Sequence, residues 1–501
     1  MQETFLFDYI KNHLDAEGRF TEAHLPDSLD PFTPKLLGAE DAYSYAVDAS
    51  VDNEGAQLVI NLLRQYAAVP CLENKRKLTD QLLTLNISQL ADGFLENFTA
   101  EDLTEDLLDL AEDYFYHSTH NEPIKFAYLL FGLYGMEHLQ QEEEDLWQDL
   151  VTMAHCEEFT FHFIYACRVT NFMPQKELWE LLLCTHGWGK VYALNAASFT
   201  TAEQKQWLIE NGCDLEADYP PLSVRMLTES NLLELLKGPQ INHASFKGAL
   251  AILNNFLLLI NSFDLATLNS NFNISSIDLE QLLTQLLRHA VVYKDNPADV
   301  LDLVALDLGL RQTAENENWF KLSSNQCQTL MGACDKLVFS RDWAAHIQEH
   351  LINDEGQLDY ILCDLAFELS LDIWEPLSTY FYQHPQEIKL LPYLLSCEAP
   401  DRAGKLIIYL EEHINDYLME PTALFTPLRY LALHPGMGTT IISAALLSMY
   451  DWPRCLACMT LEVWGEDYIT PQLRSALHAA AGLAQSPFAQ GCIFNLMSKE
   501  K

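Results

Sequence analysis

Two histidines and a glutamate have the spacing of a zinc-binding motif. His346, Glu349 and His350 form an H-x-x-E-H segment. Because residues i and i+4 share one face of a helix, the two imidazoles could bind one zinc ion while Glu349 acts as the general base of a metal-dependent hydrolase. A third protein ligand is needed, for which Glu411 and Glu412 are candidates. Because the chain has sixteen histidines, we favour the interpretation that this segment is a chance match at an exposed helix end. We therefore predict no metal site and no catalytic residue.

Two further segments resemble chemical motifs only in part. Cys455 and Cys458 form a lone C-x-x-C, which lacks two more zinc ligands and the preceding strand of a redox site. Small apolar residues facing a helical core are the favoured interpretation of this pair. The segment 436–440, G-M-G-T-T, lacks the lysine of a phosphate-binding loop, and no dinucleotide-binding glycine pattern follows a strand. We therefore predict that the protein holds no cofactor.

A tryptophan between two glycines forms the most distinctive segment, His186–Lys190 (H-G-W-G-K). Glycine lets the backbone approach another part of the chain closely, so the pattern predicts a tight reversal packed against a neighbouring helix. Trp188 would then fill the inner face of a helical hairpin, with Trp207 of the next helix as its neighbour. The alternative is that His186 and Trp188 line a binding groove. Because buried tryptophan usually belongs to a core, the structural interpretation is favoured.

The elements that must position these residues are helices. From Leu103 to Phe115, apolar residues recur at helical spacing while acidic residues occupy the opposite face. Similar stripes continue through most of the chain, and no segment alternates convincingly as a half-buried strand does. Short breaks separate helices of about 12–18 residues, which is the pattern of antiparallel helix pairs. We predict an all-α fold, and more specifically a degenerate α-solenoid of the HEAT or armadillo kind with about twelve pairs.

Two irregular segments indicate how the chain is divided. Residues 24–38 contain three prolines and are expected to run extended over the surface. Residues 268–276 are polar and rich in Asn and Ser, which is the composition of a boundary. The sequence thus predicts an N-terminal helix with a proline-containing strap (1–38), followed by two helical-repeat halves (39–267 and 268–501).

The charge of the chain restricts its partners. Against 29 Lys and Arg stand 72 Asp and Glu, which gives a formal net charge of −43. Such a charge repels nucleic acid unless a local basic stripe overcomes it, and the densest basic cluster, Lys75–Lys77, covers a single helical turn. We predict no nucleic-acid partner and favour a protein or peptide partner, above all a basic one.

Cysteine use and hydropathy favour the cytoplasm. Twelve cysteines are scattered through the chain, and the first 15 residues have neither a basic start nor a sustained apolar run. Thiols without an export signal are typical of a reducing compartment. The most apolar stretch, 249–260, is interrupted by Asn254 and Asn255 and is shorter than the ~18 apolar residues of a membrane span. We predict a cytoplasmic protein without a membrane partner.

Two blocks of the sequence stand out as a pattern. Residues 185–213 contain the H-G-W-G corner and a helix ending in W-L-I-E-N-G-C, and residues 431–464 contain a P-G-M-G turn followed by two apolar helices. Together they resemble an uncharacterised bacterial family of HEAT-like helical-repeat proteins, a resemblance that implies a helical-repeat fold. Some members carry the label limonene hydroxylase, which implies a monooxygenase. Where that family has an R-N-R-N-like turn, this chain has W-P-R-C (452–455), so the resemblance does not extend to that turn.

Three functional classes follow from these observations. We favour a non-enzymatic interaction scaffold whose helical-repeat surface binds a partner, because helix pairs and an acidic surface occur without a catalytic constellation. The alternatives are an enzyme, either the monooxygenase of the family label or the metal-dependent hydrolase, and a helical-repeat nucleic-acid enzyme, which requires a basic groove. The candidate groove or corner residues are His186, Trp188, Lys190, Trp207, His434, Arg454 and Trp464.

Overall fold

The chain folds into helices joined by short connections. The computed structural model describes residues 4–28, 36–46, 51–215, 217, 219–263, 265–272, 274–315, 322–396, 399–418, 421–484 and 486–499. These segments contain 31 α-helices and six short 3₁₀ helices (η). Extended pairing within them is limited to two isolated bridges, Leu14–Phe20 and Ile352–Leu358. The predicted all-α class is therefore confirmed.

The described residues form two compact units, with unit 1 ending at Ser340 and unit 2 beginning at Arg341. The helices of unit 1 are α1 (Leu6–Asn12), η1 (Pro26–Ser28), α2 (Ala39–Ala46), α3 (Asn53–Ala68), α4 (Leu72–Leu82), α5 (Ile87–Asn97), η2 (Ala100–Asp102), α6 (Glu105–His117), α7 (Asn121–Tyr134), α8 (Met136–Glu142), α9 (Glu144–Ala154), α10 (Glu157–Val169), α11 (Gln175–Cys184), α12 (Gly187–Ala196), α13 (Ala202–Asn211), α14 (Leu222–Glu229), α15 (Leu232–Lys237), α16 (His243–Ser262), α17 (Leu265–Asn271), η3 (Ile274–Ser276), α18 (Leu279–Tyr293), α19 (Pro297–Glu315) and α20 (Ser324–Val338). The helices of unit 2 are α21 (Trp343–His350), α22 (Tyr360–Glu368), α23 (Trp374–Gln383), η4 (Ile388–Leu390), α24 (Leu391–Leu395), α25 (Pro400–Glu412), α26 (Ile414–Tyr417), η5 (Pro421–Leu424), α27 (Phe425–Ala432), α28 (Thr439–Leu446), α29 (Asp451–Trp464), η6 (Glu466–Tyr468), α30 (Pro471–Ala481) and α31 (Pro487–Lys499).

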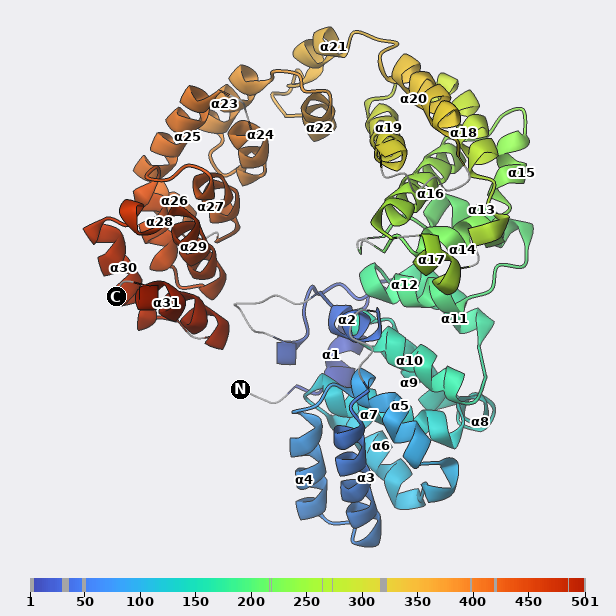
Figure 1. Cartoon of the computed structure of the whole chain (residues 1–501). Helices are drawn as coiled ribbons and strands as arrows, with labels where there is room; N and C mark the ends of the chain where they lie inside the picture. Colours follow the sequence, from blue (N-terminus) through green and yellow to red (C-terminus); the bar gives the residue numbers. More distant parts are fainter. Residues whose placement is uncertain are drawn as a thin grey trace. The chain divides into compact units, whose positions relative to one another are not determined.

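Two helices of unit 1 are buried on almost every side. In α7 all residues from Pro123 to Gly132 are buried, and in α10 nine residues between Glu158 and Cys167 are buried. Each helix packs between neighbours that lie close to it in the chain, since α7 contacts α6 and α10 while α10 contacts α9 and α12 (Figure 1). A helix that is apolar all round offers no solvent face, so a charged side chain on it needs a partner in the interior.

Helix α16 has 20 residues and is, among the described residues, the one helix long and apolar enough to cross a membrane by length and composition. In unit 1 it packs against α13 and α19, and 61% of its most apolar window is buried by the protein. Asn254 and Asn261 on α16 donate hydrogen bonds to the backbone oxygens of Asp302 and Gly309 on α19, both at 3.0 Å. The helix therefore has the packing of an interior helix of a multi-helix unit.

In unit 2 the helices likewise pack against near neighbours. Helix α29 contacts α27, α28 and α31 (Figure 1). The indole Nε1 of Trp464 at its end donates a hydrogen bond to the backbone oxygen of Leu431 on α27, at 2.7 Å. Gly438, with φ +64°, caps α28, and a Cβ atom there would lie 2.6 Å from Leu431. The turn between α27 and α28 therefore requires glycine at this position.

The division into units differs from the predicted one. The Asn/Ser-rich segment 268–276 holds the end of α17 and η3 inside unit 1, and the helices before and after it, α16 and α18, contact each other. A polar segment marks an exposed connection, but the packing of the flanking helices decides whether that connection separates two units. Of the strap predicted within 1–38, the described part contains α1 and η1, while residues 29–35 lie outside the described residues.

Candidate binding pocket beside the His186–Lys190 corner

The glycines of the corner allow α12 to begin directly on α10. The backbone N–H of His186 donates a hydrogen bond to Oε1 of Glu157 at 2.9 Å. Gly187 has φ +41°, and a Cβ atom there would lie 2.8 Å from Oε2 of Glu157. A Cβ atom on Gly189 would lie 2.9 Å from Oγ1 of Thr160. The first turns of the two helices therefore touch, as the glycine spacing predicted.

Trp188 does not pair with Trp207, contrary to expectation. Its half-buried indole has Tyr192 and Tyr219 as ring neighbours, with centroids 6.3 and 5.7 Å away. Trp207 instead lies under the ammonium group of Lys190, 5.8 Å from Nζ. Residues two apart on a helix point to opposite sides, so Trp188 and Lys190 cannot serve the same interface. Trp188 thus lines the surface side of α12.

Lys190 has a structural environment on the other side of α12. The side chain is buried, and its Nζ donates a hydrogen bond to the backbone oxygen of Asp214 at 2.8 Å. Burial lowers the pKa of this ammonium group. Trp207 completes the contact by packing edge-on against Trp179, with centroids 5.0 Å apart. These residues hold α12 against α13 and the connection after it.

A pocket of about 270 Å³ lies between α10 and α12. Its two walls are one face of α10 and one face of α12. On each helix the lining residues are three, four or seven positions apart, so they share one side of the helix. One residue of α2 and one of the segment before α14 complete the lining. The lining residues are Ala42, Phe161, Ile164, Arg168, Trp188, Val191, Tyr192, Asn195 and Tyr219. A second pocket of about 260 Å³ shares Asn195 and Tyr219 with the first.

The polar groups of the pocket are cationic or neutral. Arg168 lies exposed in the last turn of α10, and its guanidinium has no hydrogen bond or ion pair with the described residues. The exposed side chain of Asn195 likewise has no partner among them. Among the described residues that line the pocket, none is Asp or Glu, although acidic residues outnumber basic ones 72 to 29 in the chain. Arg168 gives the described lining a positive charge, which favours an anionic group.

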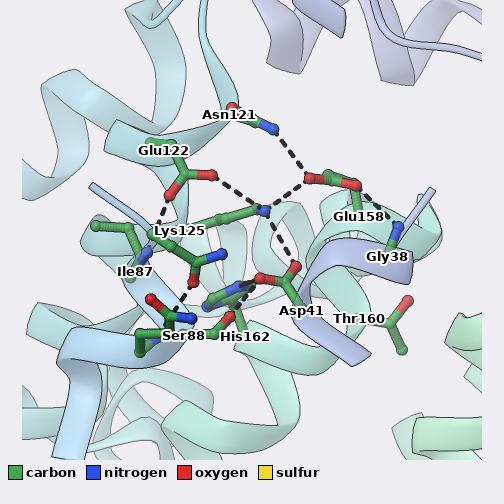
Figure 2. Close-up of polar contacts among 12 residues, drawn as sticks. Gly38, Asp41, Ile87, Ser88, Asn121, Glu122, Lys125, Glu158, Thr160 and His162 are labelled. Carbon is green, nitrogen blue, oxygen red and sulfur yellow. Dashed lines mark hydrogen bonds and ion pairs between the residues drawn. The ribbon is translucent and has the colours of Figure 1, made fainter. Parts of the chain in front are cut away.

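A buried charged cluster joins α2, α7 and α10 beside this pocket (Figure 2). At its centre, Nζ of Lys125 contacts three carboxylates: Oδ2 of Asp41 at 3.0 Å, Oε1 of Glu122 at 3.2 Å and Oε1 of Glu158 at 2.6 Å. Lys125 and Asp41 are each 1% exposed. His162 Nε2 lies 3.3 Å from Oδ1 of Asp41. One ammonium group thus balances several buried carboxylates at once.

The cluster also fixes the start of α2. Oε2 of Glu158 accepts a hydrogen bond from the backbone N–H of Gly38 at 2.8 Å, and Tyr192 donates one to the backbone oxygen of the same residue at 3.0 Å. Asp41 anchors the next turn on Lys125, while the adjacent Ala42 lines the pocket. The cluster therefore holds one wall of the pocket in place.

The charged groups of the cluster perturb one another. Burial alone lowers the pKa of Lys125, but the surrounding carboxylates outweigh it and raise the pKa well above its usual value. Burial opposes ionisation of Asp41, yet Lys125 and His162 hold the pKa of this carboxyl below its usual value. For Glu122, burial dominates and raises the pKa in spite of Lys125. Because the contacts of Lys125 join α7 to α2 and α10, we assign the cluster an anchoring role.

This cluster is not among the sites predicted from the sequence, although the sequence around Lys125 carries a signal for it. Lys125 is the one charged residue between Pro123 and Tyr134, a stretch that is otherwise apolar. A lysine inside such a helix requires a buried partner. Its partners Asp41 and Glu158 lie 84 and 33 residues away, so their identity depends on how the helices pack.

The H-x-x-E-H residues lie on α21 in unit 2. The rings of His346 and His350 are 4.3 Å apart between centroids, and Nδ1 of His350 is 2.9 Å from the backbone oxygen of His346. Glu349 and His350 are exposed. Glu411 accepts a hydrogen bond from the backbone N–H of Thr440 at 2.9 Å. The structure brings no third metal ligand to the two histidines among the described residues.

The candidates from the second block have structural contacts in unit 2. Arg454 is 1% exposed, donates to the backbone oxygens of Leu446 and Ser448, and pairs with Asp451. Its guanidinium thus caps the C-terminus of α28. His434 stacks on Tyr430 with centroids 4.0 Å apart. Trp464 is hydrogen-bonded to α27, as described above.

The C-x-x-C pair faces the interior of unit 2. Cys455 and Cys458 are 8% and 1% exposed on α29, as expected for small apolar residues in a helical core. Burial and nearby Cys492 of α31 raise the pKa of both thiols to about 12. These thiols are therefore protonated at neutral pH.

Comparison of the chain with models of protein families, with curated proteins and with solved structures finds no match.

Proposed function

We propose that the protein is a non-enzymatic binding protein that recognises a protein or peptide partner through the pocket between α10 and α12. The observation that carries the proposal is the pocket itself, in which aromatic walls meet the guanidinium of Arg168 and the amide of Asn195, neither of which has a partner among the described residues. Aromatic residues and arginine are the side chains that contribute most to recognition of protein partners. In this proposal the helix pairs form an α-solenoid of the HEAT or armadillo kind, which agrees with the resemblance to the bacterial HEAT-like family.

The lining residues favour binding over catalysis. Hydrolysis or group transfer requires a nucleophile with an adjacent base, or a pair of carboxylates. Among the described residues that line the pocket, the polar ones are Arg168, Asn195 and two tyrosines. Asp41 of α2 and Glu158 of α10, on two helices that line the pocket, are turned into the Lys125 cluster. The monooxygenase and metal-dependent hydrolase remain the alternative function.

The acidic surface extends the proposal to the partner as a whole. The formal net charge of −43 favours a partner with basic segments and disfavours nucleic acid and anionic membrane surfaces. We place the protein in the cytoplasm, where its buried thiols stay reduced.

A photo-crosslinking amino acid at position 195 tests the proposal. Asn195 lies exposed on the pocket wall, and Asn61 on α3 provides an exposed asparagine elsewhere in unit 1. We expect illumination in cells to attach one defined protein to position 195 and not to position 61. Trp188→Ala should abolish that product. No product at position 195, or the same products at both positions, would refute the proposal.

The enzyme alternative has its own test. Metal analysis and an absorption spectrum of the purified protein detect a stoichiometric metal, flavin or haem. Detection of such a group, together with oxidation or hydrolysis of a substrate, would replace the binding proposal.

A further inference from the structure

The pocket has a charged end and an aromatic end. Glu157, the first residue of α10, contacts His186 directly before α12, and Phe161 packs against Tyr192 further along the same two helices. The two helices therefore run parallel. Arg168 and Asn195 both lie near the C-terminal ends of these helices, so they share one end of the pocket.

Two of the aromatic residues, Phe161 and Trp188, lie towards the other end. Phe161 and Trp188 each precede the polar residue of their own helix by seven positions, which is about 10 Å along a helix axis. Trp188 and Tyr219 meet edge to face, with an interplanar angle of 65°. Such aromatic walls favour a ring that adds one more edge-to-face or offset contact. A ligand that fills the pocket thus places a ring near Trp188 and its polar group near Arg168.

The size of the pocket limits the ligand to about one aromatic residue. A cavity of about 150 Å³ holds benzene. The volume of about 270 Å³ leaves room for a ring and a short polar group. The adjoining pocket, which shares Asn195 and Tyr219, offers a path for the chain that carries this residue.

We propose that the pocket binds the C-terminal aromatic residue of a partner chain, with its carboxylate on Arg168 and Asn195 and its ring between Phe161, Trp188 and Tyr219. Arg168 has no hydrogen bond or ion pair with the described residues, and an arginine can form two parallel hydrogen bonds with a carboxylate. The proposal rests on the proposed function, because it specifies the part of the partner that enters the same pocket.

Peptide binding tests the proposal directly. The probes are an acetylated heptapeptide ending in Phe with a free carboxylate, the same peptide with a C-terminal amide, the same peptide ending in Ala, and 3-phenylpropionate. We expect the first peptide to bind at least ten times more tightly than the amide and than the Ala peptide, since a charged hydrogen bond is lost or the ring is absent. Tighter binding of 3-phenylpropionate than of the peptide would assign the pocket to a free aromatic acid and overturn the proposal.

Arg168→Gln separates recognition of the carboxylate from other effects. This substitution should weaken binding of the free-acid peptide about tenfold, so that the acid and amide peptides bind with equal affinity. Arg168→Lys should restore part of the difference in affinity between the two peptides. The matched control is Arg76→Gln, because Arg76 is exposed on α4 without a partner among the described residues. Unequal binding of acid and amide by Arg168→Gln would refute the role of Arg168. Loss of stability without loss of that preference would assign Arg168 to the helix terminus instead.

The outcomes for the two proposals are distinguishable. If position 195 crosslinks a partner but the peptides do not discriminate acid from amide, the terminal-carboxylate proposal fails and the binding function stands. If position 195 crosslinks nothing, the binding function itself fails.

Discussion

Lys125 is a single cation that neutralises carboxylates in the interior of unit 1. Its contacts with Asp41, Glu122 and Glu158 join α7 to α2 and α10. Removal of one partner from a buried ion pair leaves the other charge without compensation, which is far more costly than loss of a surface pair.

Lys125→Met should therefore lower the free energy of unfolding of unit 1 by about 3–5 kcal/mol. Hydrogen exchange of the α7 and α10 backbone amides measures this change in the whole chain. The matched control is Lys77→Met, because Lys77 is exposed and pairs with Glu73 on the surface of α4. We expect a much smaller change in the free energy of unfolding for the control, because solvent screens this exposed pair. Equal effects of the two substitutions would contradict the anchoring role of the cluster.

The two carboxyls with opposite pKa shifts should respond differently to pH. The pKa of Glu122 is raised above its usual 4.5, so its contribution to stability is full below that pH and is lost as the pH rises through its folded-state pKa. The pKa of Asp41 is lowered below its usual 3.8, so its contribution is full above that pH and is lost on acidification. Between pH 4.5 and 7, Glu122→Gln should gain stability relative to the wild type, whereas Asp41→Asn should show a constant deficit. Urea denaturation across this range measures both, and parallel curves for the two variants would show that the shifts are wrong.

Close helix packing in unit 1 depends on glycine at several contacts. At the contact of α16 with α13, a Cβ atom on Gly248 would lie 1.9 Å from the backbone oxygen of Ile209. Gly132 of α7 approaches α10 in the same way, since a Cβ atom on Gly132 would lie 3.0 Å from the Cα atom of Ala166. Backbone atoms cannot move aside as a flexible side chain can, so an added methyl group must separate the helices.

Gly248→Ala should lower stability by about 1–3 kcal/mol or more through this separation. Gly404→Ala on α25 is the control, because a Cβ atom there has no neighbour within 4 Å. Alanine stabilises a helix by about 1 kcal/mol relative to glycine, so the control substitution should be neutral or stabilising. Thermal unfolding followed by circular dichroism distinguishes the two. A stable Gly248→Ala variant would mean that α13 and α16 do not approach so closely.

The whole chain is organised as two compact units joined by a short connection. The four residues between α20 and α21, from Phe339 to Asp342, are all exposed. Exposed connections are cleaved by proteases more readily than helices, because a protease must bind an extended backbone.

Limited trypsin digestion should therefore cut at Arg341 before it cuts at Lys336, which lies inside α20. The resulting C-terminal fragment should keep its helical circular dichroism spectrum, since unit 2 has its own internal contacts. Mass spectrometry of the early fragments identifies the cut. Cleavage inside α20 before Arg341, or an unfolded C-terminal fragment, would contradict the division.

Local features of the structure follow from the sequence alone. The spacing of apolar residues determined the all-α class, because a helix must present a continuous apolar face to be buried. The H-G-W-G spacing also predicted the close contact of α12 with another helix, since only glycine tolerates it. The expectation for Cys455 and Cys458 rested on the same reasoning and agrees with their burial.

Tertiary structure decided which residues meet. Trp188 lines a pocket with Tyr219 rather than pairing with Trp207, because the angular position of each residue on α12 selects its neighbour. The boundary at 340/341 depends on whether flanking helices pack, which composition does not reveal. The Lys125 cluster combines residues that are far apart in the chain, so its charges are matched only when α2, α7 and α10 come together. Helix formation depends on nearby residues and was readable from the sequence, whereas these contacts depend on distant ones.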